Sequence, residues 1–372
     1  MFAFYKSDAN LYSGIKFLSW RIEMKIFLLS TVALLLAGCS GEPFYAVSIA
    51  DNENGGIYKN AQLISQLPRA SYIIRKNDTL YVTQNAARKS PDKSGKIYAV
   101  DRRTMQILQS AKVNGITPCH AAVSPDGKFL YTANYSSGSI SEIPLDHGVP
   151  SAPPRMILHQ GKGKDRRRQK SPHPHFVGFS PAGNKLFVCD LGTDEIWIYD
   201  YTPGKGIALP CTEKLKLAPG AGPRHLAFAP DGKTIYVANE LDSTVTSFYH
   251  MSGTWKMVKT ISSRPANPVA KKNFPGAIKI TSCGRYFFVT NRGDDTIAMF
   301  ATLPDGDFTL HKNVPAQGKY PSDILLSDND TILQCINLKN GTAARFKLNK
   351  AAGTLEAIPG TVTIPRGIGL CE

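Results

Sequence analysis

The sequence predicts an all-β fold, a single seven-bladed β-propeller. Three observations lead to it: a repeat of about 50 residues, short apolar runs joined by tight turns within each repeat, and a length that seven repeats fill. Six times along the 372 residues, a Gly or Asp is followed seven positions later by an Asn or Asp. The pairs are Asp78 and Asn85, Gly127 and Asn134, Gly183 and Asp190, Gly232 and Asn239, Gly284 and Asn291, and Asp330 and Asn337. Successive copies lie 49, 56, 49, 52 and 46 residues apart.

Each repeat has the same order of elements: an apolar run, a tight turn at the Gly or Asp, a second apolar run that ends at the Asn or Asp, another turn and a third run. The clearest copy is residues 225–248, HLAFAPDGKTIYVANELDSTVTSF. Such short runs bounded by turn residues predict antiparallel strands. We interpret the Asn and Asp positions mostly as turn residues, because these two types tolerate left-handed backbone conformations.

The two ends of the chain are predicted to close the ring together. Residues 44–59 (FYAVSIADNENGGIYK) and residues 361–370 (TVTIPRGIGL) lack a complete blade of their own. Pairing them would complete the seventh blade and remove an exposed sheet edge. Residues 39–372 are therefore expected to form one propeller domain, with no linker and no second domain.

Residues 1–38 are predicted to be upstream residues followed by a lipoprotein signal peptide. Residues 24–39 read MKIFLLSTVALLLAGC, with one Lys before an apolar stretch that is too short to span a bilayer comfortably. The final LAGC matches a lipobox, so Met24 is expected to be the true start and Cys39 the lipidated residue. Ser40 favours the outer membrane over the inner one. The protein would then be anchored in the bacterial cell envelope, facing the periplasm; a buried N-terminal helix is the alternative.

The composition limits the partners. The formal charge is +15, and about +13 of it belongs to residues 39–372. A basic balance favours anionic small molecules or an anionic envelope surface, with a merely solvated basic surface as the commonest alternative. Nucleic acid is excluded as a partner of an exported protein. The protein is expected to be a monomer.

The cysteines argue against a metal or redox centre. Six remain after Cys39, and none belongs to a CxxC pair, which disfavours a zinc or thioredoxin-like site. Cys189 and Cys335 lie inside apolar runs and are predicted core residues. The sequence has no phosphate-binding loop, no dinucleotide fingerprint and no metal-ligand cluster, so we expect no cofactor and no metal.

Four ionisable residues interrupt columns of the repeat that are otherwise mostly small or apolar. The column eight residues before the Gly or Asp reads Ala70, Cys119, His175, Arg224, Gly276 and Ser322. The column after the Asn or Asp reads Ala86, Tyr135, Leu191, Glu240, Arg292 and Leu338. Both columns should ring the same mouth of the central channel. A cluster of His175, Arg224, Glu240 and Arg292 is therefore a candidate site, because buried charges are costly unless they are paired or used. Alternatively, their ion pairs only tie neighbouring blades together.

Two further features lie near this cluster. His120 and His225 occupy the next position of the first strand, where alternation turns side chains away from the previous column. They are either substrate-binding residues or structural histidines bonded to a neighbouring blade. A basic insertion, residues 161–175 (GKGKDRRRQKSPHPH), enters the first strand of its blade from the same face. Its cations could grip phosphate or carboxylate groups, or form a solvated loop.

These residues resemble the seven-bladed lactonase family, whose members include propeller-type bacterial 6-phosphogluconolactonases and fungal carboxy-cis,cis-muconate cyclases. The resemblance rests on the strings PHPHF, GPRHLAF followed by NEL, and TNRGDD, and is clearest over residues 118–300. It implies that the family's active-site histidine is His175. It also implies that the arginine of GPRH is Arg224, the glutamate of NEL is Glu240 and the arginine of NRG is Arg292.

The resemblance also matches Arg168 and Gln169 with the Arg-Gln that precedes the histidine motif, as substrate-binding residues. The sixth repeat departs from the family. It has Pro321-Ser322-Asp323 where an arginine is usual, and Asn337-Leu338 where Asn-Gln is common. One wall of the pocket is therefore expected to be altered.

The expected activity is hydrolysis of a sugar-derived or other anionic lactone by an activated water. Glu240 or His175 would be the general base, and Arg224 and Arg292 would hold the oxyanion or a substrate carboxylate. A lactonising isomerase, like the muconate cyclases, would use the same residues to deliver a proton during ring closure. A non-catalytic envelope propeller that binds a ligand or a protein is the alternative from another class.

Overall fold

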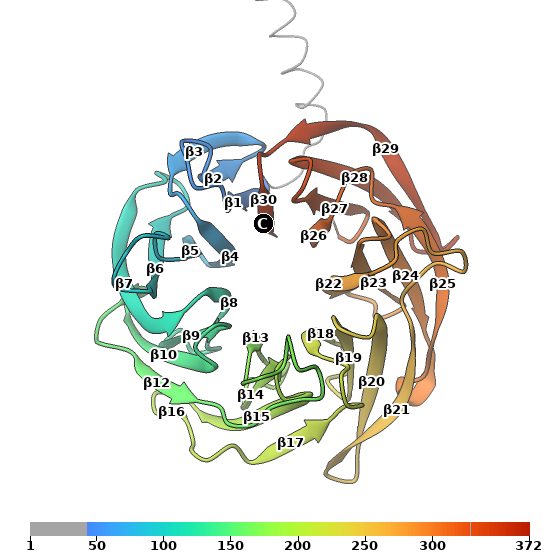
Figure 1. Cartoon of the computed structure of the whole chain (residues 1–372), viewed down its shortest axis with the longest axis horizontal. Helices are drawn as coiled ribbons and strands as arrows, with labels where there is room; N and C mark the ends of the chain where they lie inside the picture. The colour runs from blue at the N-terminus through green and yellow to red at the C-terminus, as the bar shows by residue number, and fades with distance from the viewer. Residues whose placement is uncertain (1–42, 328) are drawn as a thin grey trace, which may run out of the picture. The chain divides into compact units, whose positions relative to one another are not determined.

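The computed structural model describes residues 43–327 and 329–372, and it confirms the seven-bladed propeller (Figure 1). Seven antiparallel sheets stand around a central channel. The predicted signal peptide and Cys39 lie outside the described residues. Within the described part of the chain, no helix is long and apolar enough to cross a membrane.

The blades follow one another in sequence, and each runs from an inner strand at the channel to an outer strand. Blade one has β4 (Ala70–Lys76), β5 (Thr79–Gln84), β6 (Ser94–Asp101) and β7 (Ile107–Ile116). Blade two has β8 (Pro118–Val123), β9 (Phe129–Asn134), β10 (Ser139–Asp146), β11 (Val149–Pro150) and β12 (Arg155–Leu158). Blade three has β13 (Pro174–Phe179), β14 (Lys185–Asp190), β15 (Glu195–Thr202), β16 (Gly206–Ile207) and β17 (Glu213–Lys216).

The remaining blades are four-stranded. Blade four has β18 (Pro223–Phe228), β19 (Thr234–Asn239), β20 (Thr244–Met251) and β21 (Thr254–Ser262). Blade five has β22 (Phe274–Ile280), β23 (Tyr286–Arg292), β24 (Thr296–Thr302) and β25 (Phe308–Pro315), with the short 3-10 helix η1 (Pro304–Gly306). Blade six has β26 (Pro321–Ser327), β27 (Ile332–Asn337), β28 (Thr342–Asn349) and β29 (Thr354–Thr363). Blade seven has β30 (Gly367–Cys371), β1 (Tyr45–Ser48), β2 (Gly56–Lys59) and β3 (Gln62–Gln66).

Blade seven confirms the predicted closure of the ring by the two ends of the chain. Strand β30 is its inner strand and pairs with β1, so that Tyr45 lies opposite Cys371 and Ala46 opposite Leu370. The buried Asp323 of β26 accepts a hydrogen bond of 2.9 Å from the Leu370 amide and so ties blade six to blade seven. The predicted final strand began too early, because residues 361–363 belong to the outer strand β29.

The core of the protein lies between blades, where apolar faces of adjacent sheets pack together. Tyr236 of β19 stacks on Phe287 of β23, with ring centroids 4.2 Å apart. Phe287 in turn stacks on Phe300 of β24 at 4.7 Å. As predicted, Cys189 and Cys335 are fully buried within such layers. Each blade therefore depends on its neighbours to bury its faces.

The repeat's glycines and asparagines have different roles. Gly127, Gly183, Gly232 and Gly284 have φ between 67° and 74°, so a turn that favours glycine recurs at these four positions. The left-handed interpretation is wrong for Asn134 and its counterparts in the later repeats, which close their strands with ordinary negative φ. The side-chain amides of the asparagines donate to the next strand of the blade, as Asn134 Nδ2 does to Ser141 Oγ at 2.8 Å. Asp190, the aspartate of the third repeat, accepts hydrogen bonds instead. These asparagines link neighbouring strands of one blade.

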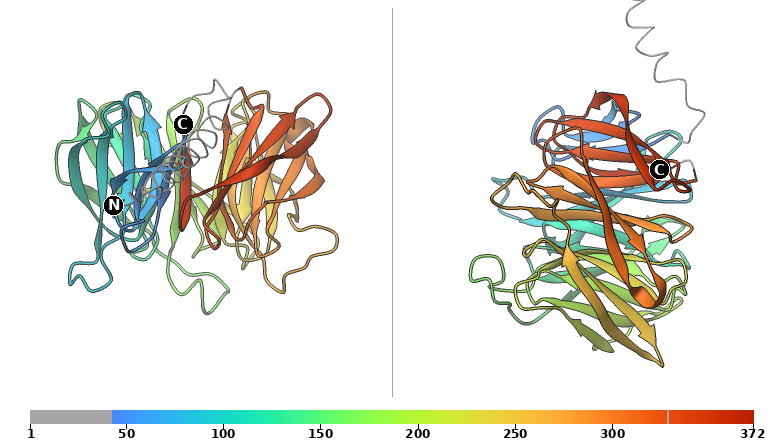
Figure 2. Two further views of the ribbon diagram at one scale, coloured as in Figure 1. Left: turned by 90° about the horizontal axis from the view of Figure 1, so that it is seen from above. Right: turned by 90° about the vertical axis from the view of Figure 1, so that its right-hand side faces the viewer.

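The start of each inner strand and the end of the next strand lie on the same face of the ring. Long loops project from this face, away from the end of β30 (Figure 2, left). One of them, green in Figure 2, is the basic insertion between β12 and β13. The topology thus gathers the two interrupted columns and the insertion at one mouth of the channel.

Removing β30 should abolish cooperative folding. Deletion of residues 367–372 takes away the inner strand of blade seven, so β1 loses one of its two neighbouring strands and the buried Asp323 carboxylate loses one of its two backbone donors. We expect the truncated protein to show no cooperative thermal transition by circular dichroism. Removal of Glu372 alone, which follows the strand, is the control and should melt like the full chain. A truncated protein that melts within a few degrees of the full chain would contradict the closure.

Candidate active site

The residues that interrupt the repeat meet at the mouth predicted for them. A pocket of about 340 Å³ opens there. It is lined by Thr117, Cys119, Tyr135, Arg168, His175, Glu240, Phe274, Arg292 and Tyr320. Blades two to six all contribute to this lining, so the pocket is a product of the closed ring. Arg224, the remaining member of the predicted cluster, lies behind Glu240.

Glu240 is the centre of the site's electrostatics, because three arginines surround its buried carboxylate. Arg168 Nη2 donates to Oε1 at 2.5 Å, and Arg292 Nη2 donates to Oε2 at 2.5 Å. Arg224 Nε lies 3.1 Å from Oε2, at ion-pair distance but without hydrogen-bond geometry. Burial alone would raise the pKa of Glu240, but Arg292 and Arg224 outweigh it and hold that pKa well below its usual value. Glu240 is therefore a stable anion and a weak base.

The arginines leave the site with excess positive charge. Three guanidinium groups meet one carboxylate, which is an excess of two charges. Burial and the nearby Arg292 lower the pKa of Arg224 to about 10. The charged form of Arg224 is therefore destabilised by its surroundings. An arrangement of this kind favours an anionic group, or a developing negative charge, in the pocket.

His175 is the ionisable group of the pocket that is neutral and can accept a proton. It is partly exposed at the start of β13, with Nδ1 3.7 Å from the Cys119 sulfur. Among the described residues, no hydrogen-bond partner is found for its Nε2. Burial and Arg224 hold the pKa of His175 well below the usual imidazole value, against the opposing effect of Glu240. Burial raises the pKa of Cys119 to about 12, so its thiol stays protonated.

The basic insertion places Arg168 in the pocket wall, and hydrogen bonds of Gln169 hold the insertion in its conformation. Gln169 does not line the pocket. Its Nε2 donates to the Leu191 carbonyl at 2.8 Å and to Asp194 Oδ1 at 2.6 Å. Its Oε1 accepts a hydrogen bond from the Asp165 amide. With its amide fully used, Gln169 positions the neighbouring Arg168 and has no group left for a substrate.

His120 and His225 lie beneath the pocket and do not line it. The ring centroids of His175 and His225 are 5.3 Å apart, and those of His225 and His120 are 5.0 Å apart. His120 stacks on Tyr72 at 4.2 Å and accepts a hydrogen bond from the Val177 amide of the next blade. Arg224 Nη1 lies 3.1 Å from His225 Nε2. His120 thus matches the structural alternative of a histidine bonded to a neighbouring blade. The hydrogen-bond contact of His225 lies within its own blade, and its ring contacts those of His120 and His175 in neighbouring blades.

A buried network that the sequence did not indicate holds the histidine segment of blade three. His159 Nδ1 lies 2.7 Å from Asp190 Oδ2, and its Nε2 lies 3.1 Å from the Tyr199 hydroxyl. The other carboxylate oxygen of Asp190 accepts a hydrogen bond from the His173 amide. His173 stacks on Tyr135 in the pocket wall at 4.4 Å. The network therefore fixes the entry to β13, and with it the position of His175.

Three further residues of the pocket, Thr117, Phe274 and Tyr320, were not predicted from the sequence. All three lie ten residues before a repeat Gly or Asp, so a third column would have found them. In the sixth blade Tyr320 lines the pocket, whereas Ser322 and Leu338, where the sequence departs from the family, do not. The Arg292 guanidinium lies 5.4 Å from the ring centroid of Tyr320, so this wall of the pocket is aromatic. Among the described residues, no three His, Cys, Asp or Glu side chains gather as metal ligands.

The comparisons with known proteins agree with this architecture. The family model of the seven-bladed β-propeller lactonases matches residues 34–370. A 6-phosphogluconolactonase of Bacillus subtilis is 31% identical over 313 residues, which cover 82% of this chain and 87% of the relative.

Solved structures extend the likeness. A periplasmic gluconolactonase of Pseudomonas aeruginosa is 26% identical, with a TM-score of 0.78 over 89% of this chain and 99% of its own. A Lactobacillus plantarum protein is 25% identical, with a TM-score of 0.79 over 89% of this chain and 98% of its own. The family match spans all but the last two residues of the described propeller and includes the four-residue cluster. The chain belongs to the seven-bladed β-propeller lactonases, a family of hydrolases.

Proposed function

We propose that this chain hydrolyses an anionic, sugar-derived lactone in the pocket at the loop-bearing mouth. The observation that carries the proposal is the excess of two positive charges around Glu240, next to a neutral imidazole. Hydrolysis of a lactone needs a base for the water and donors for the tetrahedral oxyanion. The relatives named 6-phosphogluconolactonase and gluconolactonase support a sugar lactone as the substrate class.

His175 is the general base in this proposal, and Glu240 is not. Glu240 has both oxygens bound to arginines and a lowered pKa, so it is a poor proton acceptor. His175 Nε2 takes a proton from water as the water oxygen bonds to the lactone carbonyl carbon. The resulting imidazolium then returns the proton to the ring oxygen as the carbon–oxygen bond breaks. The product is a hydroxy acid, and His175 is neutral again.

The arginines divide the remaining tasks. Arg292 lies in the pocket wall, within the cluster that includes His175, and would stabilise the oxyanion. Arg168 comes from the insertion and is 37% exposed, so it can bind an anionic substituent that enters from solvent. Glu240 keeps the guanidinium groups from repelling one another and aims them into the pocket. Arg224 supports Glu240 from behind.

The direct test is a hydrolysis assay of the purified propeller. Gluconolactone, a phosphorylated sugar lactone and muconolactone form a suitable panel, with release of acid as the measurement. The proposal expects turnover of sugar lactones and a lower KM for the anionic member. Absence of turnover with every lactone, together with measurable binding of one, would favour the binding propeller instead.

Replacement of His175 by Asn should lower kcat by about 10²–10⁴-fold, because it removes the proton acceptor. The melting temperature should change little, since within residues 43–327 and 329–372 the only side-chain hydrogen-bond contact of the ring is the weak one to Cys119. Because the pKa of His175 is lowered, the acid limb of kcat/KM in the unmodified protein should lie below pH 6.5. His147→Asn, at a fully solvated ring, is the control. An acid limb above pH 6.5 would count against His175 as the base.

Replacement of Arg168 by Ala should raise KM for an anionic lactone by about tenfold or more and leave a neutral lactone nearly unaffected. Its side chain forms a wall of the pocket, but the fold does not depend on it, since it is partly exposed. Arg167→Ala is a matched control, because this neighbour carries the same charge, is exposed and does not line the pocket. Equal effects of the two substitutions would show a general charge effect and argue against a specific contact.

Replacement of Glu240 by Gln distinguishes two roles of the charged cluster: participation in the reaction, or ion pairs that only tie neighbouring blades together. This substitution removes the negative charge that balances the buried arginines. It should therefore lower the free energy of unfolding by about 3 kcal/mol. Since the pKa of Glu240 is lowered, this stabilisation is present at neutral pH and fades only as pH falls below about 4.5. Kinetics measured well below the melting temperature decide the matter. Unchanged kcat and KM there would reduce the cluster to a structural role.

A further inference from the structure

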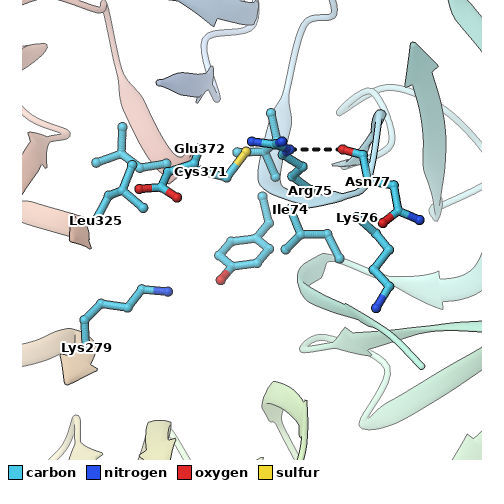
Figure 3. A pocket seen from close by; sticks show the side chains of 11 residues that line it. Ile74, Arg75, Lys76, Asn77, Lys279, Leu325, Cys371 and Glu372 are labelled. Carbon is cyan, nitrogen blue, oxygen red and sulfur yellow. Dashed lines mark hydrogen bonds between the residues drawn. The ribbon is translucent and has the colours of Figure 1, made fainter. Parts of the chain in front are cut away.

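A second cavity lies at the opposite mouth of the channel, where the inner strands end. It has a volume of about 410 Å³ and is formed by the ends of β4, β22, β26 and β30. Its polar and ionisable lining consists of Tyr72, Arg75, Lys76, Asn77, Lys279 and Glu372, together with the thiol of Cys371 (Figure 3). This volume suits a ligand the size of a sugar acid.

The two cavities are separate sites. They share no lining residue. Between them the channel is filled by packed rings: Tyr72 stacks on His120 at 4.2 Å, and His120 contacts Phe176 at 4.5 Å and His225 at 5.0 Å. His120 and His225 are over nine-tenths buried. A ligand in the second cavity therefore reaches it from the face opposite the lactonase pocket.

Lys279 gives this cavity its chemistry. It lies near the end of β22, is only partly exposed and points its ammonium group toward the centre of the channel (Figure 3). Among residues 43–327 and 329–372, the ammonium has no hydrogen-bond or ion-pair partner. After burial, Lys279 is the largest cause that lowers the pKa of His120, so its charge acts deep in the channel. The buried Asp323 carboxylate also interacts with this charge, but its two oxygens accept hydrogen bonds from the Ile324 and Leu370 amides and none from Lys279. The ammonium group therefore stays open to an anion in the cavity.

The surrounding groups reinforce this preference. Lys76 at the end of β4 adds a second partly exposed ammonium group. Arg75 donates to the Asn77 carbonyl at 3.0 Å and lies away from Lys279 (Figure 3). Glu372 is the only acidic side chain among the lining residues, and it lies on the same side of the opening as Lys279 (Figure 3). Three cationic side chains, Arg75, Lys76 and Lys279, therefore face one acidic side chain in this lining.

We propose that this cavity is a second binding site, for a small anion with carboxylate or phosphate oxygens. Lys279 binds the charged group, Lys76 adds positive charge on the other side of the opening (Figure 3), and Tyr72 offers a ring against which the rest of the ligand packs. The site is independent of the lactonase reaction, since it lies at the other mouth and behind the plug of rings.

Calorimetric titration tests the proposal with two probes, inorganic phosphate and gluconate, which distinguish phosphate from carboxylate as the preferred group. The proteins are the unmodified chain, Lys279→Met, Lys128→Met and Arg168→Ala. Lys128 is an exposed lysine in a hairpin turn at the same end of the ring and controls for general charge. Arg168→Ala weakens the lactonase pocket and leaves the opposite mouth untouched. Melting curves establish that each variant is folded.

We expect at least one probe to bind a site whose affinity falls about tenfold or more in Lys279→Met, since one charge-assisted contact is lost. That site should keep its affinity in Lys128→Met and in Arg168→Ala. The proposal is overturned if Lys279→Met binds both probes as the unmodified protein does, or if neither probe binds. Loss of the same binding event in Arg168→Ala would assign it to the lactonase pocket and would equally overturn the second site.

Discussion

One buried carboxylate organises the functional mouth of this propeller. Glu240 follows β19 in blade four, and its oxygens are shared by arginines of blade four, blade five and the insertion of blade three. Without it, three neighbouring guanidinium groups, two of them in the wall of a pocket of about 340 Å³, would have no opposite charge between them. The same interaction thus sets the blade contacts, the positive field and the low pKa of Glu240, whereas burial and Arg224 lower the pKa of His175. Stability and chemistry depend on the same group here.

The repeat made much of this visible without a structure. A period near 50 residues predicted seven blades, and the deviations from the repeat pointed to His175, Arg224, Glu240 and Arg292. This worked because a propeller places equivalent positions of every blade at equal height around one axis. Charged residues that interrupt these otherwise small or apolar columns are therefore expected to meet at the same mouth of the channel. Ring closure was equally predictable, since two incomplete ends can be completed only by one another.

Other features depended on tertiary contacts that no column records. His159 lies after an outer strand, outside the repeat frame, yet its bond to Asp190 fixes the entry to β13. From the sequence, Asn134 and the asparagines at the same repeat position are expected to be turn residues, but they are buried hydrogen-bond donors. The sequence does not distinguish these roles, because asparagine suits both. Gln169 matched a substrate-binding position by sequence, but its amide is used within the loop. Hydrogen-bond partners, rather than residue types, decide these assignments.

Closure by β30 also constrains how the protein reaches its native state. Tyr45 and Cys371 face one another in one blade, although nearly the whole chain separates them. Such a distant contact forms late, because the entropy of closing so long a loop must be overcome before the pairing contributes stability. Until then β1 offers its backbone groups to any strand nearby, including one from another copy of the chain. The ring that shields every inner strand in the finished protein thus leaves one strand open to mispairing throughout folding.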